Sequence, residues 1–223
     1  QRPGIFALMR AAGIQQAPQS IRDISFTLGP RINAAGRMDH AQRVVDLLME
    51  TSETRATEVA REVEDMNLKR REVDEATTEQ AFAQLEQSDP DAFCTVVSGK
   101  DWHRGVVGIV ASRLIEKRYR PSIVLSEEDG MLIGSARSVD GVDIHNALEK
   151  CSELLHQFGG HTMAAGLSLK VENLELFKER LEIAMKEQLN HEPPQPKVHC
   201  DQEVKLGDLT LEAFRELQQL EPF

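Results

Sequence analysis

The sequence predicts a mixed α/β fold, and three features of the 223-residue chain indicate it. Short β-like runs alternate with helical patterns over residues 92–190, which is typical of a compact α/β domain. Residues 41–89 contain neither Gly nor Pro and form a long helical stretch before that domain. Pro193, Pro194 and Pro196 mark a linker after it.

The helical stretch divides into two predicted helices. A shorter helix is expected near residues 41–50, and a long amphipathic helix from about residue 54 to residue 88, where Asp89 and Pro90 end it. Charged residues fill most positions of the long helix, so that a narrow apolar stripe remains, as in a helix that connects two lobes. The apolar residues recur at steps of three to four residues or multiples of them: Val59, Val63, Met66, Val73, Ala76 and Phe82.

Predicted strands and helices alternate after Pro90 and build the α/β domain. Asp129 and Gly130 are expected to form a tight turn between two of the strands. The predicted strands are 93–97, 122–125, 131–136 and 166–169, and the predicted helices are 106–117, 143–150 and 173–189.

The tail after the linker is predicted as one strand, 198–204, and one short helix, 209–220. Two elements of this size cannot bury a core of their own. We therefore expect the chain to stop inside a further domain.

The net charge of −11 disfavours a nucleic-acid binder at first sight. The acidic residues, however, gather mainly in residues 46–95 and 171–223, which are largely helical in pattern. A charged helix face is usually a solvated face. The glycine-rich motifs described below stay neutral or basic, so nucleic-acid binding remains open.

Composition also bears on the cellular setting. No run approaches the ~18 apolar residues that cross a bilayer, and the first residues lack the pattern of a secretory signal. The widely spaced Cys94, Cys151 and Cys200 argue against a disulfide framework or a CxxC zinc site. These features predict a cytoplasmic protein in a reducing compartment.

A first motif runs from Gly29 to Arg37. Arg31 and Arg37, separated by small residues and bounded by glycines, could bring guanidinium and backbone N–H groups close to a phosphate. A tight turn whose arginines cap a helix or pair with nearby acids explains the composition equally well.

A second motif runs from Trp102 to Ala111. Its loop and glycine-containing helix start could expose backbone N–H groups to an anion. Gly105 and Gly108 could equally serve close packing of a helix on a sheet, and His103 alone is more often a hydrogen-bonded loop residue than a ligand.

Two further motifs follow a strand and a pair of glycines. Ser135, Arg137 and Ser138 form a plausible phosphate clamp, although a surface Arg flanked by hydroxyls is a weak signal. Gly159 and Gly160 permit backbone conformations that other residues avoid and would place His161 at a close approach. That pattern suggests either an anion site or a proton-transfer His.

The sequence lacks the motifs of several catalytic classes. It contains no Walker A, GxSxG or HExxH pattern. A two-metal hydrolase needs several converging carboxylates and imidazoles, and no such set can be assembled here. Asp39 and His40 are interpreted as a helix N-cap and its neighbour, so no metal ligand is identified.

Taken in order, the four motifs resemble the RecJ branch of the DHH phosphoesterase superfamily over about residues 2–189. The segments 30–37, 102–111 and 159–166 carry the resemblance, and the first of them narrows it to RecJ. The resemblance implies a two-lobed enzyme in which the first lobe holds two manganese or magnesium ions. A long helix leads from that lobe to a DHH-associated domain that grips the strand, and an OB-type domain follows.

On this resemblance the chain divides into four parts. These are a remnant of the DHH lobe (1–50), the connecting helix (51–90), the DHH-associated substrate-binding domain (91–191), and a linker with the start of the next domain (192–223). Leu220 to Phe223 resemble the opening of a segment that the family continues. The chain is therefore expected to be a fragment without the metal site.

The implied activity is 5′-to-3′ exonuclease action on single-stranded DNA in repair and recombination, with a single-stranded-DNA-binding protein as a further partner. A small-nucleotide phosphodiesterase or phosphatase of the same superfamily and a stand-alone nucleic-acid-binding module are the alternatives. The residues implied in binding substrate or phosphate are Arg31, Asn33, Arg37, Trp102, His103, Ser135, Arg137, Gly159, Gly160 and His161.

Overall fold

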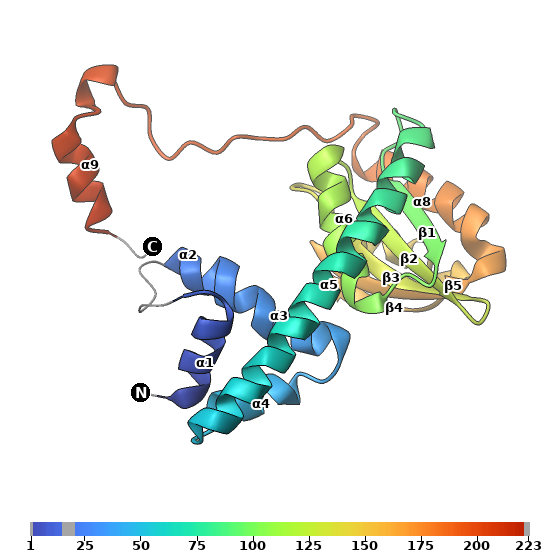
Figure 1. Ribbon diagram of the computed structural model, residues 1–223. Coiled ribbons are helices and arrows are strands. Elements are labelled where there is room, and N and C mark those ends of the chain that lie inside the picture. The colour runs from blue at the N-terminus through green and yellow to red at the C-terminus, as the bar shows by residue number, and fades with distance from the viewer. Residues whose placement is uncertain (1, 15–20, 221–223) are drawn as a thin grey trace. The chain divides into compact units, whose positions relative to one another are not determined.

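The computed structural model describes residues 2–14 and 21–220 and divides into two compact units (Figure 1). Unit 1 comprises residues 1–69 and 197–223, and unit 2 comprises residues 70–196. The expected family segment at residues 221–223 lies outside the described residues, as do residues 1 and 15–20 of the predicted first domain.

Unit 2 is built on a five-stranded mixed sheet, which confirms the predicted α/β fold. The strand order is β1-β2-β3-β5-β4, so β1 and β4 form its edges. β1 and β2 pair in parallel, and the other neighbours are antiparallel. The strands are β1 (Thr95–Lys100), β2 (Ser122–Glu128), β3 (Met131–Arg137), β4 (Leu155–His161) and β5 (Ala164–Lys170).

Local sequence explains the connections around the middle of the sheet. Helix α6 (Arg104–Lys117) links the parallel strands β1 and β2, which a short turn could not join. Asp129 and Gly130 join β2 to β3 with φ angles of 49° and 78°. Two consecutive positive φ angles are typical of the type I′ turn that Asp-Gly favours, so this predicted hairpin is confirmed.

Alternating side chains of the strands bury two faces of the sheet. On β2, Ile123 and Leu125 belong to one core, while Val124 belongs to another with residues of α6. The first core also contains residues of α7 (Ile144–Glu149) and α8 (Leu174–Gln188), and Figure 1 shows α6 and α8 on opposite sides of the sheet.

Unit 1 is helical in its described part. Its core contains residues of α1, α3, α4 and the first half of α5. Helix α5 is one continuous 35-residue element that begins in unit 1 and ends in unit 2, which confirms the predicted long helix. The elements are α1 (Pro3–Ala11), α2 (Ile21–Asp23), a π-helical turn (Ile24–Leu28), α3 (Gly29–Met38), α4 (Gln42–Met49), α5 (Glu53–Gln87), a 3₁₀ turn (Leu206–Asp208) and α9 (Leu211–Gln218).

Three predictions of local structure are corrected. The first motif is helix α3 rather than a tight turn, because Pro30 occupies an early helical position where its missing N–H is tolerated. Asp39 is the residue after α3 and accepts a hydrogen bond from Arg43 Nε at 2.9 Å, so it does not cap the start of α4. The tail segment 198–204 forms no strand because no neighbouring strand pairs with it among the described residues.

A buried carboxylate joins α5 to α6 within unit 2. The Asp74 side chain is 1% exposed. Its Oδ2 accepts from Arg113 Nη2 at 2.7 Å and from Arg70 Nη1 at 3.4 Å, while Thr78 Oγ1 donates to Oδ1 at 3.4 Å. Two guanidinium groups therefore compensate the negative charge of a side chain that water does not reach.

Cys94, Cys151 and Cys200 are free thiols. Cys94 and Cys151 are buried in the core of unit 2, and Cys200 is exposed. Burial raises the pKa of the Cys94 thiol well above its ordinary value and raises the pKa of Cys151 to about 11. Both buried thiols are therefore protonated and unreactive at neutral pH.

Candidate phosphate-binding site

Ser135 and Arg137 lie on the same face of strand β3, because they are two residues apart. Arg137 Nη1 donates to Ser135 Oγ and to the backbone oxygen of Ala136, both at 2.8 Å. These contacts hold the guanidinium group beside the strand. We call Ser135 and Arg137 the clamp.

The strand register brings the clamp into line with the predicted glycine motif. Arg137 pairs with Ala164 on β5, and Ala164 pairs with His161 on β4. Two residues further along β3, Ser135 pairs with Gly166 on β5, and Gly166 pairs with Gly159 on β4. Because paired residues point to the same face of a sheet, the clamp and the glycine motif share one surface. That arrangement unites four of the predicted site residues on one face: Ser135, Arg137, Gly159 and His161. Gly160 is in register with Ala165 and Ala136, so it belongs to the opposite face.

The glycines of β4 and β5 differ in whether the protein leaves room for a side chain at their positions. Gly160 has φ of +152°, and an added Cβ would lie 2.3 Å from the backbone oxygen of Ala164. A Cβ on Gly159 would meet nothing within 4 Å, and one on Gly166 would meet its nearest atom at 3.9 Å. The fold therefore requires Gly160 but not the other two, although glycine weakens a strand. We call the paired Gly159 and Gly166 the bare floor, which leaves space for a ligand to approach the backbone.

Replacing Gly160 with alanine is expected to lower the free energy of unfolding by about 2 kcal/mol, because the new Cβ meets backbone in a strained conformation. The neighbouring Gly159→Ala substitution is the matched control and is expected to leave stability unchanged. Urea unfolding followed by circular dichroism measures both. Equal losses in the two variants would contradict this division of the glycines.

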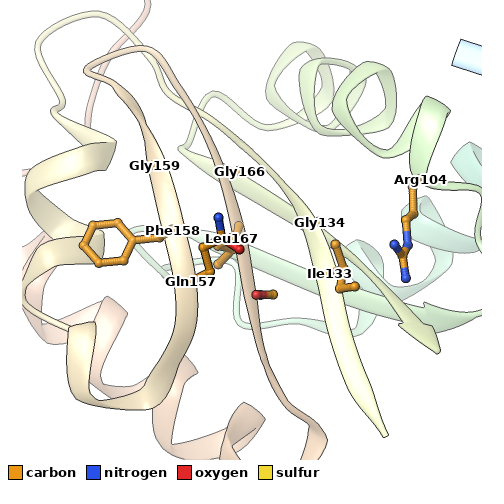
Figure 2. Close-up of a pocket in the computed structure, with 9 residues that line it drawn as sticks. Arg104, Ile133, Gly134, Gln157, Phe158, Gly159, Gly166 and Leu167 are labelled. Carbon is orange, nitrogen blue, oxygen red and sulfur yellow. The ribbon is translucent and has the colours of Figure 1, made fainter. Parts of the chain in front are cut away.

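A hollow of about 470 Å³ lies over the bare floor (Figure 2). Figure 2 shows Arg104, from the start of α6, across the hollow from the residues of β4, with Ile133 of β3 between them. The ring of Phe158 turns away from Arg104 and lies 5.6 Å from the ring of His145. The lining residues are Arg104, Ile133, Gly134, Gln157, Phe158, Gly159, Gly166, Leu167 and Ser168.

His161 is exposed, and its ring is oriented by the chain that follows it. The backbone N–H of Met163 donates to His161 Nδ1 at 3.2 Å. Because Nδ1 is the acceptor in this contact, the neutral imidazole carries its hydrogen on Nε2. His161 can therefore donate a hydrogen bond to an anion from Nε2 without becoming charged.

The second motif contributes to this region through a residue that the sequence did not single out. His103 caps α6, with its Nδ1 accepting from the N–H of Gly105 at 3.0 Å. Trp102 is only 5% exposed and donates from Nε1 to Gln80 Oε1 at 2.8 Å, so its ring belongs to the core. Arg104 lines the hollow instead and pairs with Glu128. The sequence signal that could have identified Arg104 as a site residue was its position directly after His103.

The first motif lies in unit 1 and is arranged by the helical period of α3. Arg31 donates from Nε and Nη2 to the carboxylate of Glu64, the latter at 3.0 Å, and from Nη1 to Thr27 O at 2.7 Å. Asn33 and Arg37 are four residues apart and share another side of the helix. The structure therefore places Arg31 against α5 and does not bring it together with Asn33.

The described residues contain neither a metal-binding cluster nor a membrane-spanning helix. Within residues 2–14 and 21–220, no group of three or more His, Cys, Asp or Glu side chains could hold a metal ion. The described residues thus do not fit a two-metal centre. No helix in the same ranges is long and apolar enough to span a membrane.

Comparison with known proteins agrees with this geometry. Residues 90–187 match the DHHA1 domain. The single-stranded-DNA-specific exonuclease RecJ of Bacillus subtilis is 37% identical over all of this chain and 28% of its own length. The Escherichia coli exonuclease of the same name is 35% identical over all of this chain and 40% of its own length.

Solved structures give the same result. RecJ from Thermus thermophilus in complex with Mn²⁺ superposes with a TM-score of 0.85 at 30% identity, covering all of this chain and 32% of that one. Another exonuclease RecJ bound to manganese gives 0.72 at 31% identity, over 82% of this chain and 45% of that one. The chain thus spans less than half the length of these relatives. The whole of this chain is thus similar to a part of the RecJ exonucleases, and residues 90–187 match the DHHA1 domain.

Proposed function

We propose that this chain is the DNA-gripping part of a 5′-to-3′ single-stranded-DNA exonuclease that acts in DNA repair and recombination, and that it does not cleave DNA alone. The observation that carries the proposal is the clamp of Ser135 and Arg137 beside the bare floor. The names of the relatives, which are single-stranded-DNA-specific exonucleases, support the choice of substrate.

The chemistry of the surface fits a phosphate better than a base. Arg137 offers a guanidinium charge, while Ser135 Oγ and His161 Nε2 offer neutral donors. The bare floor exposes the glycine backbone of β4 and β5, and the ring of Phe158 points away from it. Because Phe158 is the aromatic residue among those that line the hollow and its ring turns away from Arg104, we infer that stacking contributes little and that base selectivity is low.

Hydrolysis in the intact protein is assigned to divalent metal ions. Structures of RecJ relatives contain Mn²⁺ or Mg²⁺, whereas the described residues of this chain do not fit such a centre. We infer that manganese or magnesium is held by a further part of a longer protein, and that the clamp orients the strand toward it. A cytoplasmic location and a single-stranded-DNA-binding protein as partner belong to the same proposal.

Binding of a 5′-phosphorylated single-stranded oligonucleotide, followed by fluorescence anisotropy, tests the proposal. If Arg137 neutralises about one phosphate, raising salt from about 50 to 200 mM should weaken binding roughly threefold. Adding manganese should change neither the affinity nor the length of the oligonucleotide. Absence of binding at low salt, or cleavage by the purified chain, would contradict the proposal.

Gly166→Val is expected to weaken binding about tenfold while the protein stays folded, because valine favours a strand but fills the bare floor. A Cβ at Gly166 would meet its nearest atom, the backbone oxygen of Gly134, at 3.9 Å, which is ordinary contact. Anisotropy and a thermal melt of the same sample separate the two effects. The control is Gly207→Val, since Gly207 also has open space but lies outside unit 2.

A further inference from the structure

Gly108 of helix α6 faces the clamp across the gap between the helix and strand β3. A Cβ added at Gly108 would lie 2.8 Å from Arg137 Nη2 and 3.2 Å from Ser135 Oγ. Ordinary contacts between such atoms are about 3.5–4.0 Å. The space in which the guanidinium group lies therefore exists because residue 108 has no side chain.

The atoms that surround Gly108 distinguish it from glycines that the fold requires. At Gly134, an added Cβ would lie 2.0 Å from the backbone oxygen of Val124, so the sheet itself excludes a side chain there. At Gly108, the three nearest atoms all belong to the side chains of Arg137 and Ser135. Gly108 also lies inside a regular helix, where alanine is more favourable than glycine. The stability of helix α6 thus favours alanine at residue 108, whereas the space needed by the Arg137 and Ser135 side chains favours glycine.

We propose that Gly108 is a positioning residue: by leaving space beside strand β3, it holds the Arg137 guanidinium in the pose that receives a DNA phosphate. This inference rests on the proposed function of the clamp. The sequence allowed two interpretations of Gly108: anion binding by its own N–H, or close packing of the helix backbone on the sheet. The positioning role differs from both.

The flexible side chain of Arg137 determines what a methyl group at residue 108 would change. The end of an arginine side chain moves more easily than a backbone, so Gly108→Ala should displace the guanidinium rather than unfold unit 2. The displaced group would lose its hydrogen bonds to Ser135 Oγ and Ala136 O. A phosphate grip depends on guanidinium geometry as well as charge. The variant should therefore fold normally and bind DNA poorly.

A double-mutant cycle tests the proposal with four proteins: the parent, Gly108→Ala, Arg137→Ala and the double variant. Affinity for a 5′-phosphorylated single-stranded oligonucleotide is measured by anisotropy, and Tm by calorimetry. Gly108→Ala is expected to weaken binding about tenfold without lowering Tm. In the Arg137→Ala background it should cause no further loss of affinity, because the group on which it acts is gone.

Stability supplies a readout that does not depend on DNA. Gly108→Ala should raise Tm more in the Arg137→Ala background than in the parent, since the helix gains alanine without a clash. Gly207→Ala, at a glycine with open space, is the control and should leave binding unchanged in both backgrounds.

Each outcome decides one question. Unchanged binding by Gly108→Ala, or a further tenfold loss in the double variant, would overturn the positioning role. If Arg137→Ala binds DNA like the parent, the proposed function of the clamp fails. In that case the Tm values still test the contact between residue 108 and Arg137. An equal Tm change from Gly108→Ala in both backgrounds would show that the two residues are not in contact. A larger rise in Tm in the Arg137→Ala background would show that they are.

Discussion

Replacing Arg137 with alanine is expected to weaken the binding of 5′-phosphorylated single-stranded DNA by roughly 10- to 100-fold. A hydrogen bond between charged groups contributes about 1.5–3 kcal/mol, which corresponds to that range of affinity. The loss should be accompanied by little change in Tm, because Arg137 is only partly buried and its hydrogen bonds to Ser135 Oγ and Ala136 O join it to neighbours on its own strand. In a longer exonuclease that carries this chain, turnover should fall at least as far, since a misplaced strand reacts poorly.

Two variants make the Arg137 experiment specific. Arg180→Ala removes an equal charge from an exposed position of α8 and should change affinity little. Arg137→Lys keeps the charge but loses the planar donor geometry, so it should recover only part of the binding. Turnover of the longer enzyme that is unaffected by Arg137→Ala would disprove the assignment of the clamp.

Replacing Asp74 with alanine is expected to lower the free energy of unfolding of unit 2 by about 3 kcal/mol. The substitution removes the buried carboxylate that Arg113 and Arg70 share, and the Arg70 side chain, which is 13% exposed, loses a partner where water has little access. Such a loss should appear as a lower urea midpoint with an unchanged m-value.

The neighbouring Glu75→Ala is the matched control, because Glu75 is an exposed acid on the same helix. Its effect should stay within about 0.5 kcal/mol. Asp74→Asn keeps the shape and one oxygen acceptor, so it should be destabilised less than the alanine variant. If Glu75→Ala and Asp74→Ala unfold at the same urea concentration, the buried ion cluster contributes no specific stability.

Much of the fold could be predicted because its signals are local. The long helix α5 follows from a stretch without Gly or Pro, and the β2–β3 hairpin follows from Asp129 and Gly130. The clamp could also be predicted in part, since Ser135 and Arg137 alternate on one strand. The sequence alone could not show which other residues would complete the site.

The remaining parts depend on contacts between distant segments. Strand β4 was missed because its glycines and polar residues have low strand propensity, and it forms by pairing with β5. The clamp meets the glycine motif only because β5 lies between β3 and β4, an order that no local pattern encodes. Likewise, the pairing of Arg31 with Glu64 joins residues 33 positions apart. Trp102, in the loop before α6, is buried in a core and donates a hydrogen bond to Gln80 of α5, which is 22 positions away.

The position of β4 at the edge of the sheet bears on self-association. Among the described residues, no strand pairs with the outer side of β4, and an exposed edge of this kind can recruit a strand from a second molecule. Two features oppose such recruitment: the shift in register between Leu155 and Gln157, and the consecutive glycines Gly159 and Gly160. Gly159, which belongs to the bare floor open to a ligand, therefore also helps to protect the concentrated protein against edge-to-edge aggregation.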